Sequence, residues 1–186
     1  METKRKAILD AALGLISRRG FHAAPMSLLA REAGVGAGTI YRYFKSKDEL
    51  IEELYKFAML DLSRSILAAY SEDLAPKERF RRLWLKACRY CIENPKKIVF
   101  LEQYENSPYF RKSLEEEHYR YFQPVFDFFE HAIEEGIVKD LPMEMLLSLS
   151  WEVTVCLAKK HLTGKLALDE RLTEAAMEAC WDAIKR

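Results

Sequence analysis

Residues 28–50 read LLAREAGVGAGTIYRYFKSKDEL and place small and apolar side chains at the spacing of a helix-turn-helix. Ala30 is small enough for two helices to cross closely, and Gly34 can adopt the left-handed backbone of a tight turn. Ile40 can then hold the second helix against the first. The opposite face of the second helix is left free to enter a major groove. This stretch therefore predicts a helix pair that binds DNA.

The whole chain predicts an all-α fold. Of its 186 residues, 49% are apolar and 31% are charged, and only seven Gly and six Pro interrupt it. We expect about nine helices, with a helix-turn-helix DNA-binding domain over residues 1–47 and a ligand-binding and dimerisation domain over residues 48–186. No signal-peptide core and no run of about 18 apolar residues is present. We therefore expect a cytoplasmic protein that does not contact a membrane.

Local signals place several helix boundaries. Ser46 and Glu49 form a capping box, which predicts the start of a long helix at the end of the DNA-binding module. Another long helix is expected over residues 108–135. Within it, Pro124 lacks an amide donor, so a kink or a break is expected just before that residue. A further helix is expected over residues 142–164.

Charge is distributed unevenly along the chain, although the net charge is zero. Residues 1–47 carry nine Lys or Arg and three Asp or Glu, whereas residues 48–186 carry 20 and 26. A cationic segment joined to an anionic body indicates that the first segment meets a polyanion and that the body does not. The alternative is that these cations form only the solvated face of a helix.

Residues 4–50 resemble the DNA-binding module of the TetR family of bacterial transcriptional repressors. The resemblance rests on the segments ILDAALGLISRRGF, AREAGVGAGTIY, YRYF and KSKDEL. The rest of the chain resembles the family in length and helix rhythm. Residues 47–55 and 84–95 are most similar to members that repress multidrug efflux systems. The resemblance implies a repressor that binds a palindromic or pseudopalindromic operator as a dimer.

The resemblance also implies which residues contact DNA. Those implied to bond phosphates are Thr39, Tyr43 and Lys47. Those implied to lie near base edges are Ala37, Gly38, Tyr41 and Arg42. Family members often have Ser or Thr where this chain has Pro25, at a position that caps the second helix of the module and can contact a phosphate. Ser27 is expected to take the place of that residue.

Physical chemistry supports part of this assignment. Lys47 at a helix start adds its charge to the exposed amides there, which favours a phosphate oxygen. Arg42 has a forked guanidinium that can bond N7 and O6 of guanine together. The alternative for Tyr41 and Phe44 is that both rings pack in the small core of the module.

One such module covers only a few base pairs, so we expect two copies held about 34 Å, or one DNA turn, apart. The last two expected helices carry apolar stripes that can form a four-helix bundle with a second copy. The residues of these stripes are Met145, Leu149, Val153, Cys156, Leu172, Ala176, Ala179 and Cys180. The alternative is that these apolar residues pack inside the core of their own chain.

Aromatic side chains are dense in the second domain, and a pocket for a flat hydrophobic or cationic effector is expected among them. Its expected lining is Tyr55, Trp84, Tyr90, Phe100, Tyr104, Phe122, Phe126 and Trp151. The acids expected nearby, one of which would favour cationic ligands, are Glu102, Glu105, Asp127 and Glu152. Effector binding is expected to move the helix that starts at Lys47 and to release DNA. The alternative is that these rings are ordinary core and surface residues.

Other classes of protein are less well supported. Cys88 and Cys91 form a C-x-x-C pair on an apolar helix stripe, and no second pair and no nearby His pair completes a zinc site. Buried structural thiols are therefore expected, and a redox role of the pair is the alternative. The stretch 115–118 holds three Glu and a His, yet no nucleophile lies at a convincing spacing from a base. We therefore expect no enzyme, no cofactor and no metal. An architectural DNA binder without an effector is the remaining alternative.

Overall fold

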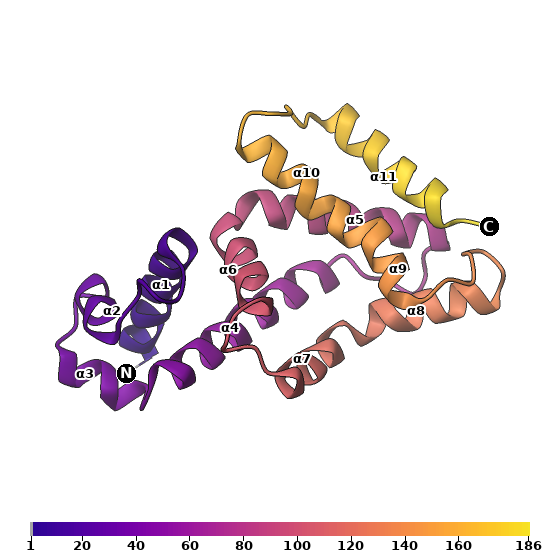
Figure 1. The fold of residues 1–186 in the computed structure, drawn as a ribbon. Coiled ribbons are helices and arrows are strands. Elements are labelled where there is room, and N and C mark those ends of the chain that lie inside the picture. Colours follow the sequence, from indigo (N-terminus) through magenta and orange to yellow (C-terminus); the bar gives the residue numbers. More distant parts are fainter. Residues whose placement is uncertain (1) are drawn as a thin grey trace. The chain divides into compact units, whose positions relative to one another are not determined.

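The computed structural model describes the backbone of residues 2–186 and their side chains except those of Glu2, Glu115 and His118 (Figure 1). The described residues form helices and no strand, which confirms the all-α class. The α-helices are α1 (Glu2–Arg19), α2 (Met26–Glu32), α3 (Ala37–Tyr43), α4 (Lys47–Leu67), α5 (Pro76–Glu93), α6 (Pro95–Glu105), α7 (Lys112–Tyr119), α8 (Gln123–Glu134), α9 (Met143–Leu147), α10 (Val153–Leu162) and α11 (Glu170–Ile184).

Two of the expected helices are divided, so the described chain has more α-helices than the nine expected. A 3-10 turn, Arg120–Phe122, separates α7 from α8. The break before Pro124 is thus confirmed, and this residue lies at the start of α8, where a missing amide donor costs little. A π-helical turn, Ser148–Glu152, separates α9 from α10.

The chain folds as two compact units. Unit 1 contains Met1–Leu60 and Lys96–Glu115, and unit 2 contains Asp61–Pro95 and Glu116–Arg186. Unit 1 therefore holds α6 as well as the first three helices. The expected division at residue 47 separates DNA binding from effector binding and dimerisation, whereas the two units are separated by how densely their residues contact one another. The functional division stays a prediction.

The core of unit 1 holds the helix-turn-helix together. Leu29, Ala30 and Ile40 are all buried, as the sequence predicts. Gly34 has φ +64°, a left-handed conformation that lets the chain turn between α2 and α3. The side-chain cap of the predicted capping box is present, because Ser46 Oγ accepts the Glu49 amide at 3.1 Å. The Glu49 carboxylate accepts the amide of Lys45 at 2.6 Å, one residue before the N-cap position.

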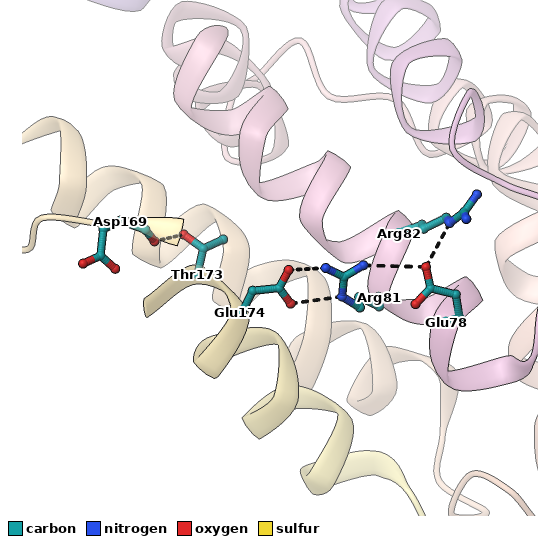
Figure 2. A network of polar contacts seen from close by, with 6 residues as sticks. All are labelled: Glu78, Arg81, Arg82, Asp169, Thr173 and Glu174. Carbon is teal, nitrogen blue, oxygen red and sulfur yellow. Dashed lines mark hydrogen bonds and ion pairs between the residues drawn. The ribbon is translucent and has the colours of Figure 1, made fainter. Parts of the chain in front are cut away.

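The core of unit 2 forms around one face of α5, which packs against α10 and α11. Trp84 lies there among buried rings that include Phe128 and Trp181. At the edge of this core, Arg81 makes two parallel hydrogen bonds to the Glu174 carboxylate and so ties α5 to α11 (Figure 2). The hydrogen bond to Glu174 raises the pKa of Arg81.

Candidate functional site

The helix α3 presents most of its side chains to solvent. It has seven residues, and Ile40 is the one that is buried. Phe44, directly after α3, is also in the core at 1% exposure, so the alternative of a core position is confirmed for this ring. Tyr41 is 53% exposed, so the alternative that its ring packs in the core is excluded. A short helix anchored at one edge thus leaves a free face for a partner.

The other residues expected to contact DNA differ in exposure. Ala37, Gly38 and Arg42 are exposed, as is Ser27 on α2. Thr39, Tyr43 and Lys47 are half-buried. Pro25 is the N-cap residue of α2, and its side chain has no oxygen that could accept a backbone amide. The start of α2 therefore has no side-chain cap. Ala37, Gly38, Tyr41 and Arg42, the four residues expected near base edges, are therefore all open to solvent.

Lys47 has partners that the sequence did not predict. Its Nζ donates a hydrogen bond to the Phe21 carbonyl oxygen. The same atom lies 5.8 Å from the centre of the Tyr109 ring. Burial lowers the pKa of Lys47, while the nearby Asp48 carboxylate acts in the opposite direction. No local sequence pattern links residue 109 to the DNA-binding module, so this contact could be found only from the fold.

Some cations of unit 1 are bound to neighbouring acids. Arg5 pairs with Glu53, and its guanidinium lies 5.4 Å from the centre of the Phe44 ring. Arg111 pairs with Glu52. The positive charge of this module therefore serves internal contacts as well as any contact with a polyanion.

Three of the aromatic residues expected in an effector pocket are in unit 1. Tyr55 and Tyr104 stack with ring centres 4.2 Å apart, and both are buried. Phe100 is buried beside them and lies 5.9 Å from the ring centre of Phe21. These rings form part of the core of unit 1.

The other five expected pocket residues are in unit 2, where Trp84 and Tyr90 are buried and the rest are half-buried. The half-buried ones are Phe122, Phe126 and Trp151. One of these residues is hydrogen-bonded to an acid: the Tyr90 hydroxyl donates to Asp61 Oδ2 at 2.7 Å. Burial and this hydrogen bond raise the pKa of Tyr90. Sequence reasoning missed Asp61, which is 29 residues away on α4.

The residues expected at a dimer interface are exposed to different degrees. Met145 is 48% exposed, and Cys156 and Ala179 are also exposed. Cys180 is only 5% exposed and packs in the core of unit 2, so the intramolecular alternative applies to it. The remaining four are half-buried: Leu149, Val153, Leu172 and Ala176.

Cys88 and Cys91 have the environment of structural thiols. Cys88 and Cys91 are each 1% exposed. Burial raises the pKa of Cys88, which lowers its reactivity. Among the described residues, no group of His, Cys, Asp or Glu is arranged to hold a metal. The side chains of Glu115 and His118, considered above as acid or base groups, lie outside the described residues.

No described helix combines the length and the apolar character that a membrane span requires.

Family models match both parts of the chain. Residues 8–54 match the bacterial regulatory proteins of the tetR family. Residues 76–185, more than half of the chain, match the tetracyclin repressor-like C-terminal domain. Both matches are to transcriptional regulators and not to enzymes.

Individual relatives agree with these models. A helix-turn-helix transcriptional regulator of Haemophilus influenzae is 30% identical over 96% of this chain and 94% of its own. The structure of a TetR-family regulator from Vibrio parahaemolyticus is 38% identical with a TM-score of 0.86, covering 98% of this chain and 99% of the other. A regulator from Marinobacter aquaeolei, 21% identical, has the same fold with a TM-score of 0.95, over 99% of this chain and 96% of the other. The chain belongs to the TetR family of bacterial transcriptional regulators.

Proposed function

We propose that this protein is a one-component repressor, which binds a palindromic or pseudopalindromic operator as a dimer and leaves it when a small effector binds. The observation that carries the proposal is the exposed face of α3, where Tyr41 and Arg42 face solvent while Ile40 anchors the helix. A large exposed ring beside an exposed guanidinium suits a groove that offers base edges and phosphates. The proposed place of action is the cytoplasm.

The proposed DNA contacts divide into two kinds. Ala37, Gly38, Tyr41 and Arg42 lie near base edges, and Arg42 reads a guanine. Backbone phosphates are bonded by Ser27, Thr39, Tyr43 and Lys47. An ammonium carries three N–H donors, so the hydrogen bond from Lys47 to Phe21 is compatible with a further bond to a phosphate oxygen.

Dimerisation is proposed through α9, α10 and α11. Two modules are needed because one reads too few base pairs for useful specificity. The exposed Met145, Cys156 and Ala179 supply the first contacts of this surface. Leu149, Val153, Leu172 and Ala176 are half-buried and contribute the parts of their side chains that remain exposed.

The proposed effector is a small hydrophobic or aromatic cation that binds in the second domain. Asp61 supports the cationic class, because its carboxylate accepts a hydrogen bond from the hydroxyl of the buried Tyr90, which places an acid beside an aromatic residue of unit 2. This class also fits the resemblance to repressors of multidrug efflux. Binding is proposed to favour a state in which the two copies of α3 no longer fit successive major grooves.

Selection of duplexes from a random pool by the purified protein tests the DNA part of the proposal. We expect enrichment of a sequence with two related half-sites, and a dimer by light scattering. A monomer that retains duplexes without sequence preference would instead support an architectural DNA binder. For the effector, aromatic cations are titrated while Trp fluorescence and binding of the selected duplex are measured together. If diverse cations change neither signal, the effector proposal is wrong.

A further inference from the structure

The ammonium group of Lys47 is held by groups from two segments that are distant in sequence. Phe21, in the loop between α1 and α2, offers its carbonyl oxygen to Lys47 Nζ. Tyr109, between α6 and α7, places its ring centre 5.8 Å from the same atom. A cation at this distance is attracted to the face of an aromatic ring. The position of the ammonium group is therefore defined by more than its own flexible side chain.

The ring of Tyr109 is itself fixed on unit 1. Its centre lies 5.2 Å from that of the Phe21 ring. Two residues further along, Arg111 pairs with Glu52, and its guanidinium lies 3.9 Å from Asp48 Oδ2. Both acids belong to the first part of α4, so the segment that carries Tyr109 is tied to the helix that carries Lys47. Arg111 also gives Asp48 a cationic partner other than the adjacent Lys47.

We propose that Tyr109 is a positioning residue for DNA binding, whose ring holds the Lys47 ammonium at the start of α4 for contact with a phosphate. This inference rests on the phosphate contact proposed above for Lys47. At that place the exposed amides and the dipole of α4 also favour an anion. Tyr109 lies outside residues 8–54, which match the DNA-binding family model. The functional DNA-binding unit of this chain would then include the segment after α6.

A double-mutant cycle on the full-length chain tests the inference. Lys47→Met, Tyr109→Leu and the double variant are compared for affinity to the duplex selected from the random pool, over a series of salt concentrations. Lys47→Met should lower the salt slope by about one for each bound module. Tyr109→Leu should weaken binding about two- to fivefold for each module, as loss of a cation–ring contact predicts. In the Lys47→Met background, Tyr109→Leu should have no further effect.

Two variants make the cycle specific. Tyr109→Phe keeps the ring and should retain wild-type affinity within about twofold, since the ring face is what attracts the cation. Tyr70→Leu removes a ring that lies 5.6 Å from the Arg79 guanidinium in unit 2, the same kind of contact at another place. This control should leave DNA affinity unchanged. Thermal unfolding of every variant shows whether it is folded at the assay temperature.

The outcomes separate the two proposals. If Lys47→Met weakens binding but Tyr109→Leu does not, or if their effects add, the role of Tyr109 is wrong and the contact of Lys47 stands. Equal losses in Tyr109→Phe and Tyr109→Leu also contradict the role of the ring. If Lys47→Met changes neither the affinity nor the salt slope, the phosphate contact itself fails, and the role of Tyr109 fails with it.

Discussion

The helices α3 and α5 use their side chains in opposite ways. Of the seven residues in α3 one is buried, whereas α5 has seven buried residues among eighteen. α3 stays helical because its turn and its single anchor fix it, and it keeps its other side chains for a partner. The side chains of α5 instead hold unit 2 together. Recognition and stability are thus assigned to different helices, and substitutions should separate them.

The largest expected effect is on the stability of unit 2. Phe128→Ala should lower the free energy of unfolding by about 3–5 kcal/mol, because it empties a fully buried ring position in the core that also holds Trp84. Urea denaturation measures this loss. Glu130→Ala, on the exposed side of the same helix, is the matched control and should change stability by less than about 0.5 kcal/mol. Equal losses in the two variants would contradict the assignment of this core.

The next effect concerns recognition by α3. Arg42→Ala should reduce discrimination at one base pair by about 1–3 kcal/mol, since a forked contact to guanine is lost. Its stability should stay close to that of the wild type, because the side chain is exposed. Competition binding with single-base variants of the selected duplex measures the discrimination. Lys47→Ala is the control and should weaken all sites alike, because its proposed partner is a phosphate. An unchanged base preference in Arg42→Ala rules out direct reading by this residue.

The turn before α3 sharpens the comparison, because two nearby glycines should respond with opposite signs. Gly34→Ala should destabilise the protein by about 1–2 kcal/mol, since an L-residue is disfavoured at φ +64° even though open space surrounds the position. Gly38→Ala, inside α3 and also without a close neighbour, should stabilise it by about 0.5–1 kcal/mol. Thermal unfolding measures both. Stabilisation by Gly34→Ala would show that the turn has another conformation.

The smallest effect is expected at the surface of unit 2. Arg81→Ala removes the paired hydrogen bonds to Glu174 seen in Figure 2. Because both side chains are about one-third exposed, the loss should be only about 0.2–1 kcal/mol. It should decrease further in high salt. Urea denaturation at two salt concentrations checks this, with Arg82→Ala as a more exposed control. A loss as large as that of Phe128→Ala would mean that this ion pair, rather than the apolar core, holds α11 in place.

Sequence patterns predicted the local features of the fold well. The side-chain cap at Ser46, the left-handed turn at Gly34 and the break before Pro124 depend on neighbouring residues, and all three are confirmed. The core positions of Leu29 and Ile40 also followed from helical spacing. These features arise from contacts within a few turns of chain, which a single sequence displays directly.

Contacts between distant segments were not predicted. The pairing of Tyr90 with Asp61 and the position of Tyr109 beside Lys47 depend on how helices meet in the fold. The expected effector residues also divide between the two units, with Tyr55 in unit 1 and Trp84 in unit 2. Aromatic composition predicts that rings gather, but it does not determine which rings share a core.

The π-helical turn at Ser148–Glu152 changes what a second copy of the chain would meet. A regular α-helix advances by about 100° per residue, so one extra residue in a turn rotates everything after it by about that angle. Met145 and Cys156, before and after this turn, therefore cannot continue a single straight seam. A partner docking here would have to engage two short, mutually rotated patches, and deleting one residue of the turn would realign them at the expense of the packing beyond.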